Sequence, residues 1–157
     1  MDLGCYCVNL FRFLLESEPI AARAAWKLDD KRGVDVTTVG ILRFPKDIFA
    51  SFLCSMLASG QNRYEVVGTE GHIEVPVAFA PGITGAYPDV KKIAKETIVK
   101  SSSEKNDIVV SAVDQYKLEV EHFSRCVREG KLLSPAENGY ANMRAMDMVR
   151  EGCLHSL

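Results

Sequence analysis

The order of apolar and polar positions predicts a helix at the start of the chain. Residues Leu3 to Leu15 repeat at helical spacing, and the residue before Pro19 disfavours a continued helix. The apolar positions lie three or four residues apart, so they share one side of the predicted helix. The positions that we expect this repeat to turn toward the core are Leu3, Cys7, Leu10, Phe11 and Leu14.

Three segments after this helix have the composition of strands. The last two are separated by "PKD" at Pro45 to Asp47, which is typical of a turn. Proline presets its own backbone angle, and aspartate bonds back to the main chain. The predicted strands cover residues 20–28, 34–44 and 48–57.

Both faces of the third predicted strand are apolar. Its even positions include Phe52 and Met56, and its odd positions include Phe49 and Leu53. A sheet that is exposed on one side alternates cleanly between apolar and polar positions. We therefore expect both faces to be covered, one by helices of this chain and the other by another domain or subunit.

The middle of the chain predicts a hairpin and two short edge strands. Tyr64 to Val67 and Ile73 to Val77 flank a turn that contains glycine. Two short apolar segments lie around a polar connector within residues 96–113, and residues 78–89 are expected to form a loop. These elements extend the run of strands before the last third of the chain.

The last third of the chain predicts two helices. The first repeats from Tyr116 to Val127 and ends at Gly130. "SPAE" at Ser134 to Glu137 has the pattern of a capping box with proline at the first helical position, and this helix is expected to run to about Cys153. The positions that we expect it to turn toward the core are Tyr140, Met143, Met146 and Val149.

The order of these elements predicts an α+β fold in which a sheet packs against helices. At 157 residues the chain has the size of one ordinary domain with a core of its own. We therefore expect residues 1–157 to form a single domain.

Composition and charge argue against several classes of protein. The net charge is −2 and the basic residues are scattered, so the basic stripe of a nucleic-acid-binding protein is absent. No apolar run reaches the roughly 18 residues that span a membrane. Asp2 and Arg12 interrupt what would otherwise resemble a signal peptide. The five cysteines are an odd number, which favours free thiols and a cytoplasmic location.

Motifs for a metal ion or a bound phosphate are also absent from the sequence. His72, His122 and His155 lack the spacing of metal ligands. Cys5 and Cys7 would point away from each other on a helix, so we expect buried thiols. "GTEG" from residue 68 lies between strands rather than before a helix, and predicts a hairpin turn instead of a phosphate loop. We predict no metal site and no cofactor site in this chain.

Three polar residues, Asp2, Tyr6 and Asn9, share one side of the first predicted helix, because they are four and then three residues apart. One interpretation is structural: Asp2 caps the helix, while Tyr6 packs its ring and hydrogen-bonds its hydroxyl. The other interpretation makes Tyr6 a general acid/base that a carboxylate and an amide orient. A free phenol titrates near about 10, so that role needs a neighbouring cation, which this side of the helix does not supply.

The same residues carry a resemblance to a known family. "MDLGCYCVNLFRFLL" resembles the D-x-G-x-H/Y helix in the C-terminal domain of the glucose–fructose oxidoreductase and inositol dehydrogenase (Gfo/Idh/MocA) family. The likeness continues in the family's order through "VDVTTVGILRFP", "YEVVGTEGHIEV" and "SPAENGYANMRAMDMV", and covers nearly the whole chain. Tyr6, in place of the more usual histidine, is similar to the branch with xylose dehydrogenases and dihydrodiol dehydrogenase.

The resemblance implies a large, mostly antiparallel sheet with helices on one face, and an open face available for a homo-oligomer. It also implies oxidation of a sugar or polyol CH–OH group, with hydride passed to NAD(P). By motif position Tyr6 is the implied proton-transfer residue and Asp2 its carboxylate companion, and we assign Asn9 beside them to substrate binding. The missing cation is implied to be the lysine of the family's E-K-P motif.

The sequence departs from the family pattern because it contains neither that lysine nor the G-x-G-x-x-G of a nucleotide-binding domain. We therefore expect this chain alone to be a C-terminal substrate-binding and dimerisation domain that binds no NAD(P) and is inactive. A non-catalytic sugar-binding or oligomerisation module is the alternative, and a non-functional remnant is a third.

Overall fold

The computed structural model describes the chain except for residues 60–61, 80–95, 102–105, 111–113, 134 and 155–157. The chain forms two compact units, one of Met1–Ser59 with Ser134–Leu157 and the other of Gly60–Leu133. Each unit contains one antiparallel sheet. Helices together with antiparallel strands make this an α+β fold, as the sequence predicts.

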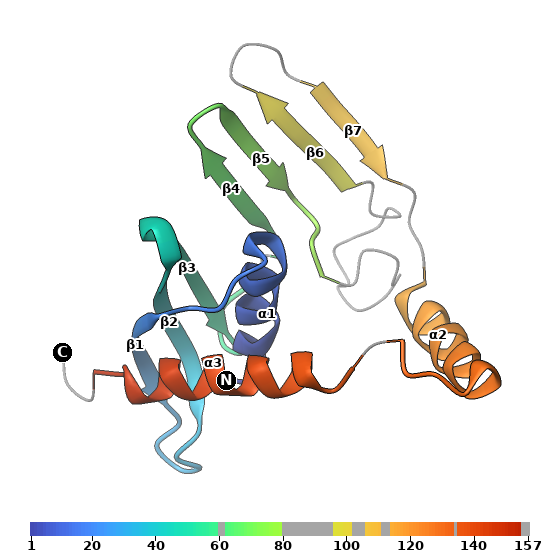
Figure 1. The fold of residues 1–157 in the computed structure, drawn as a ribbon. Helices are drawn as coiled ribbons and strands as arrows, with labels where there is room; N and C mark the ends of the chain where they lie inside the picture. Colours follow the sequence, from blue (N-terminus) through green and yellow to red (C-terminus); the bar gives the residue numbers. More distant parts are fainter. Residues whose placement is uncertain (60–61, 80–95, 102–105, 111–113, 134, 155–157) are drawn as a thin grey trace. The chain divides into compact units, whose positions relative to one another are not determined.

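The first unit packs a three-stranded sheet against two helices. The strands β1 (Ala21–Leu28), β2 (Asp35–Phe44) and β3 (Ile48–Ser55) pair in that order. The helices α1 (Gly4–Leu15) and α3 (Glu137–Glu151) lie on the same face of this sheet (Figure 1). All of these bounds agree with the sequence predictions to within two residues, because hydrophobic periodicity changes sharply at each boundary.

Alternation along β2 separates a buried face of the sheet from an exposed one. Thr38 and Leu42 are fully buried, whereas Val39 and Ile41 beside them are 45% and 52% exposed. Successive side chains of a strand point to opposite faces, so this pattern requires that helices cover one face only. Phe52 of β3 lies opposite Gly40 in the register and is buried on the helix-covered face.

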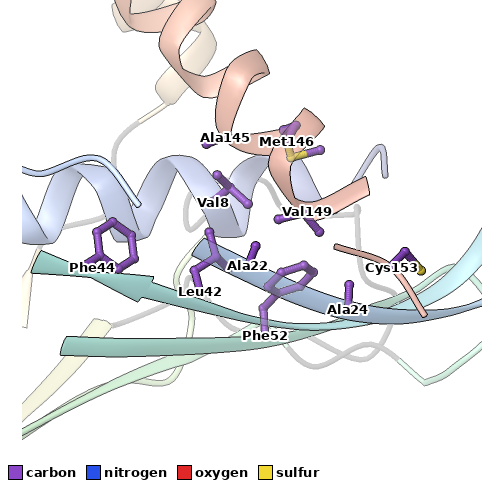
Figure 2. Close-up of a cluster of buried hydrophobic side chains, with 10 residues drawn as sticks. All are labelled: Val8, Ala22, Ala24, Leu42, Phe44, Phe52, Ala145, Met146, Val149 and Cys153. Atoms are coloured by element: carbon purple, nitrogen blue, oxygen red, sulfur yellow. The ribbon is translucent and has the colours of Figure 1, made fainter. Parts of the chain in front are cut away.

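The covered face and the two helices enclose one hydrophobic core (Figure 2). Figure 2 shows side chains of the sheet directed toward Val8 of α1 and Val149 of α3, which are both fully buried. Full burial of an aliphatic side chain of this size contributes about 1.5–3 kcal/mol relative to exposure. The core comprises Val8, Ala22, Ala24, Leu42, Phe44, Phe52, Ala145, Met146, Val149 and Cys153.

Main-chain hydrogen bonds join the end of α3 to β1. The Ala24 N–H donates to the Gly152 carbonyl at 3.1 Å, and the Leu154 N–H donates to the Ala24 carbonyl at 2.9 Å. A Cβ atom at Gly152 would lie 2.3 Å from the carbonyl oxygen of Ala22. The two backbones can therefore approach this closely only because residue 152 has no side chain.

The turn between β2 and β3 is the predicted "PKD" segment, Pro45–Asp47, which forms one short 3-10 turn. Lys46 and Asp47 both have left-handed backbone angles, with φ of 62° and 55°. Residues other than glycine pay a steric cost in this region of about 1–2 kcal/mol each. The turn is therefore strained, although its place in the chain is the predicted one.

The second face of the β1–β3 sheet carries exposed apolar side chains. Phe49 and Leu53 of β3 are 65% and 66% exposed, and Leu53 lies opposite Val39 in the register. Ile41 is exposed on the same face. Within the described part of the chain only one face of β3 is thus covered, and its coverage by another domain or subunit stays a prediction.

The second unit contains a four-stranded sheet. Strands β4 (Tyr64–Gly68) and β5 (Gly71–Val75) form the predicted hairpin, and "GTEG" from residue 68 provides its turn. Strands β6 (Glu96–Ser101) and β7 (Asn106–Val110) continue the sheet in order. The predicted loop at 78–89 lies almost entirely outside the described residues.

Helix α2 (Gln115–Glu129) follows this sheet in the chain. Its first turn is capped by Asp114, whose carboxylate accepts hydrogen bonds from the N–H groups of Tyr116 and Lys117 at 3.0 and 3.1 Å. Gly130, with φ of 61°, ends the helix as predicted. Its apolar repeat from Tyr116 to Val127 is exposed, and no side chain of α2 is buried among the described residues.

The predicted core-facing side of α1 is correct only in part, because Cys7 and Phe11 pack against the core but Leu3 and Leu14 do not. Leu3 and Leu14 are 37% and 40% exposed, and the buried positions are instead Gly4, Val8 and Arg12. The apolar repeat misplaces the face because it treats arginine as a surface residue. In the structure Arg12 is only 8% exposed, and hydrogen bonds satisfy its guanidinium group.

The predicted core-facing side of α3 is half correct. Met146 and Val149 are buried, but Tyr140 and Met143 are 68% and 50% exposed. The buried position in the first half of the helix is Asn142, which accompanies Arg12 of α1. Ser134 of the predicted capping box lies outside the described residues, and the helix begins at Glu137, after the N-cap residue Ala136, which provides no side-chain cap.

The strands of the described residues form two sheets, of three and four strands, rather than the single large sheet that the family resemblance implies. The division falls between β3 and β4: in the part of the chain that the structure describes, β3 pairs with β2 alone and β4 pairs with β5 alone. The antiparallel character of the strands is as expected.

Candidate active site

Asp2, Tyr6 and Asn9 all lie on the exposed side of the first helix. Tyr6 and Asn9 are on α1, three residues apart, and Asp2 lies in the turn just before it. The side chain of Tyr6 is 57% exposed. The three residues therefore lie at the surface, and their role in binding a ligand stays a prediction.

Asp2 does not cap this helix. The N-cap residue is Leu3, and no side chain forms a capping hydrogen bond there. The main-chain carbonyl of Asp2 accepts a hydrogen bond from the Cys5 thiol at 2.9 Å, but this leaves the carboxylate uninvolved. The expectation that Asp2 caps the helix is therefore wrong, and Asp2 itself is exposed.

Arg12 lies on the opposite, buried side of α1. Its Nε and Nη2 atoms each donate to a different carboxylate oxygen of Glu18, both at 2.8 Å. This two-pronged geometry fixes the plane of the guanidinium group. The remaining nitrogen, Nη1, points toward α3 and toward Asn9.

The side-chain oxygens of three asparagines lie within hydrogen-bond distance of Nη1. Arg12 Nη1 lies 3.1 Å from Asn138 Oδ1, 3.4 Å from Asn9 Oδ1 and 3.5 Å from Asn142 Oδ1. Asn142 in turn donates from Nδ2 to the carbonyl oxygen of Cys5 at 3.2 Å. We call Arg12, Glu18, Asn9, Asn138 and Asn142 the arginine network.

The arginine network also shifts protonation equilibria. The hydrogen bonds that Arg12 donates to the Glu18 carboxylate raise the pKa of Arg12 and lower the pKa of Glu18. Burial opposes both shifts and is the smaller effect. Both groups are therefore charged at neutral pH, although Glu18 itself is 59% exposed.

The thiols near α1 are unsuited to nucleophilic chemistry. Burial, with the proximity of Cys54 and Cys5, raises the pKa of Cys7 to about 11. Burial also raises the pKa of Cys5 and of Cys54. Protonated thiols are poor nucleophiles and poor metal ligands, which agrees with the expectation of packed free cysteines.

A cavity of about 410 Å³ lies at another edge of the first unit. Asp35 forms an ion pair there with the amino group of Met1, and also accepts a hydrogen bond from the Thr38 hydroxyl at 3.0 Å. These hydrogen bonds together outweigh burial and lower the pKa of Asp35. The cavity is lined by Met1, Trp26, Leu28, Gly33, Val34, Asp35 and Arg150, so none of the three predicted site residues borders it.

The described residues contain no group of three or more histidine, cysteine, aspartate or glutamate side chains placed to hold a metal ion. His72 on β5 and His122 on α2 are both partly buried. Among the helices described, none is both long and apolar enough to cross a membrane.

The start of the chain matches a known domain. A model of the GFO/IDH/MocA C-terminal domain matches residues 1–74. This region contains α1, the whole β1–β3 sheet and most of the β4–β5 hairpin. The candidate residues Asp2, Tyr6 and Asn9 therefore lie inside the matched segment.

Curated relatives extend the likeness over almost the whole chain. D-xylose 1-dehydrogenase (NADP+) of Haloarcula marismortui is 28% identical over 156 residues, which cover 96% of this chain and 40% of that protein. Trans-1,2-dihydrobenzene-1,2-diol dehydrogenase of Mus musculus is 25% identical over 135 residues, covering 86% of this chain and 39% of that protein. The chain thus spans about two fifths of the length of these relatives.

Solved structures have the same fold. A mutant of KijD10, a 3-ketoreductase from Actinomadura kijaniata in complex with TDP-benzene and NADP, superposes with a TM-score of 0.81 at 20% identity and covers 98% of this chain and 46% of that one. Aldose-aldose oxidoreductase from Caulobacter crescentus, complexed with glycerol, gives a TM-score of 0.73 at 20% identity, with 95% and 43% covered.

Proposed function

We propose that this chain is the C-terminal substrate-binding and dimerisation domain of an NAD(P)-dependent oxidoreductase of the GFO/IDH/MocA family, whose C-terminal-domain model matches residues 1–74. The substrate class is the CH–OH group of a sugar or polyol, which is consistent with the names of the relatives. The observation that supports this proposal is that Asp2, Tyr6 and Asn9, on and just before α1, are all exposed.

Tyr6 is the proton-transfer residue of this proposal. Oxidation of an alcohol to a carbonyl releases a proton from oxygen and a hydride from carbon. Tyr6 as a phenolate accepts the proton, bound NAD(P)+ supplies the hydride acceptor, and in the reduction direction the Tyr6 phenol returns the proton. Its exposure lets the hydroxyl group meet a bound substrate directly. Asp2 provides a carboxylate that orients the phenol, and the Asn9 amide can both donate to and accept from sugar hydroxyl groups.

The starts of α2 and α3 do not fit the pyrophosphate of a dinucleotide. Pyrophosphate sites use free N–H groups at the start of a helix that follows a glycine-rich loop. In α2 those groups already donate to the Asp114 carboxylate, and α3 begins with the acidic Glu137. We therefore assign the nucleotide site, and the cation that activates the phenol, to residues outside this chain.

The open face of the β1–β3 sheet is proposed as the surface for a second copy of the chain. It presents Val39, Ile41, Phe49 and Leu53, all at least 45% exposed. A cluster of this kind is typical of a protein interface rather than of a free surface. Sedimentation of the chain should show a dimer that Leu53→Lys weakens, whereas Val34→Lys, at an exposed position before β2, leaves it intact. A wild-type monomer at all concentrations contradicts this assignment.

The catalytic assignment is tested in a joined enzyme, made by placing a nucleotide-binding domain of the family upstream of Met1. With NADP+ and an aldose such as D-xylose, we expect turnover that Tyr6→Phe lowers by about 10²-fold or more, because general acid/base catalysis is worth about 10²–10⁴-fold. Tyr140→Phe is the matched control, since Tyr140 is a comparably exposed tyrosine on another helix, α3. Equal turnover by Tyr6→Phe refutes the role.

The alternative is a module that binds sugar or assembles without chemistry. The open apolar sheet face favours it, since that face serves assembly whether or not Tyr6 acts. Calorimetry of the chain against D-xylose and NADPH separates the two readings. Sugar binding by the chain, combined with a joined enzyme that never turns over, supports the alternative.

A further inference from the structure

One buried polar side chain of α1 and one of α3 are required neither by the hydrophobic core nor by the proposed chemistry. Arg12 and Asn142 are each 8% exposed, in a unit whose other buried side chains are almost all apolar. Buried ionic and polar groups are seldom the most stable choice, since an apolar pair of similar volume is often as good or better. Stability alone therefore does not explain why these two polar side chains are buried here.

The hydrogen bonds of Asn142 lead to the proposed catalytic turn. Its Nδ2 donates to the Cys5 carbonyl at 3.2 Å. That carbonyl belongs to the peptide group whose nitrogen is the nitrogen of Tyr6, and a peptide group is planar. Holding the Cys5 oxygen thus holds the plane from which the Tyr6 side chain departs.

The side-chain oxygen of Asn142 is connected through Arg12 to Asn9, the proposed substrate-binding residue. Asn142 Oδ1 lies 3.5 Å from Arg12 Nη1, and the same nitrogen lies 3.4 Å from Asn9 Oδ1. Arg12 cannot swing away from this position easily, because Glu18 holds its other two nitrogens at 2.8 Å. The side chain of Asn9 is thereby oriented from the buried side of its own helix.

We propose that Asn142 is a positioning residue, which with Arg12 sets the placement of Tyr6 and Asn9 for the substrate. This inference rests on the proposed function. Asn142 comes from α3, so the geometry of the α1 face is set by a segment more than 120 residues away in the sequence. Such support matters because a misplacement of about 1 Å can lower a rate by about 10²-fold.

Two substitutions separate positioning from simple packing. Asn142→Ala removes both hydrogen bonds, whereas Val149→Ala removes a fully buried side chain from the same helix without touching the arginine network. Both weaken the docking of α3, but only the first removes the side-chain hydrogen bond to the Cys5 carbonyl, which then keeps only its bond within the helix. Asn142→Asp is the third variant, since it keeps an acceptor for Arg12 and loses the donor to Cys5.

The first measurement uses the chain itself and needs no activity. In ¹⁵N-labelled protein we expect Asn142→Ala and Asn142→Asp to shift and broaden the backbone amide signal of Tyr6, and Asn142→Ala also the side-chain amide signals of Asn9. Val149→Ala should leave these signals close to those of the wild type. Unchanged Tyr6 and Asn9 signals in Asn142→Ala overturn the inference, whatever the outcome for the proposed function.

The second measurement uses the joined enzyme under conditions where every variant is folded. We expect Asn142→Ala and Asn142→Asp to lower kcat by about 10-fold, with a smaller change in KM for the sugar, and Val149→Ala to leave kcat within about twofold. If Val149→Ala lowers kcat as much as Asn142→Ala does, Asn142 acts only through packing and the positioning role is refuted. If Tyr6→Phe is fully active, the proposed chemistry fails, while the signals of the first measurement still decide whether Asn142 positions the turn.

Discussion

Replacement of Gly152 by alanine should destabilise the chain, although the backbone angles alone predict the opposite. Gly152 has φ of −79° and ψ of 5°, which alanine adopts without strain. At such a position Gly→Ala stabilises proteins by about 0.4–1 kcal/mol, because it restricts the unfolded chain. The sign of the effect thus depends on the space around the new Cβ atom.

That space is occupied by backbone. The Cβ would lie 2.3 Å from the Ala22 oxygen and 2.9 Å from the Ala22 carbonyl carbon, and neither atom can rotate away. Relief requires the end of α3 to separate from β1, which breaks the two hydrogen bonds of Ala24. At about 1 kcal/mol each, with about 1 kcal/mol for partial exposure of Cys153, the cost is about 3 kcal/mol. After the gain in the unfolded state, we expect a net loss of about 2–3 kcal/mol.

Urea unfolding followed by the fluorescence of Trp26 measures this loss. Trp26 is the single tryptophan of the chain and lies on β1, two residues from Ala24. Gly139→Ala is the matched control in the same helix, because nothing lies within 4 Å of its Cβ position, and it should stabilise by up to about 1 kcal/mol. The reasoning is refuted if Gly152→Ala unfolds at the same or a higher urea concentration than the wild type, with an unchanged slope.

Two further predictions concern the β2–β3 turn and the ion pair of the arginine network. Lys46→Gly should raise the free energy of unfolding by about 0.5–1 kcal/mol, because Lys46 has φ of 62° and glycine relieves that strain, and a lower urea midpoint contradicts this. Arg12 lowers the pKa of Glu18 from its ordinary value of 4.5, so the stability it contributes is present above that value and is lost as pH falls through the folded value. Glu18→Gln should therefore be less stable than the wild type at pH 7, but nearly as stable at an acidic pH where Glu18 of the wild type is protonated. Urea midpoints measured at both pH values should show this, with Glu129→Gln as the exposed control. A loss of equal size at both pH values would mean that charge plays no part.

The elements of the first unit were predictable from the sequence because each boundary carries a local signal. The strand β2 alternates apolar and polar residues up to Phe44, and Pro45 then stops it. The end of α1 is likewise marked by Pro19 a few residues on, and Glu16 adopts the left-handed conformation of a helix C-cap. Propensity and periodicity act within such short windows, so these bounds came out within two residues.

The sides of the helices were not predictable in the same way, because they depend on partners far along the chain. Arg12 reads as an interruption of an apolar repeat until Glu18 and Asn142 are brought beside it. A signal did exist in α3, where Asn138 and Asn142 are four residues apart and so share one side of the helix. Two asparagines at that spacing in a predicted core helix indicate a buried polar partner, but they do not identify it.

The candidate site therefore depends on more of the chain than the segment that bears its residues. A helix of 12 residues is marginally stable in isolation, and α1 has no side-chain cap. Its order comes from tertiary contacts, with Val8 in the core and Arg12 and the Cys5 carbonyl bonded to α3. Removal of residues 134–157 would expose Val8 and leave Arg12 without its α3 partners, although Asp2, Tyr6 and Asn9 would all remain. In ¹⁵N-labelled protein, a chain truncated in this way should lose the defined amide signals of Tyr6 and Asn9. The candidate site would then require α3 as much as α1, the helix that carries Tyr6 and Asn9.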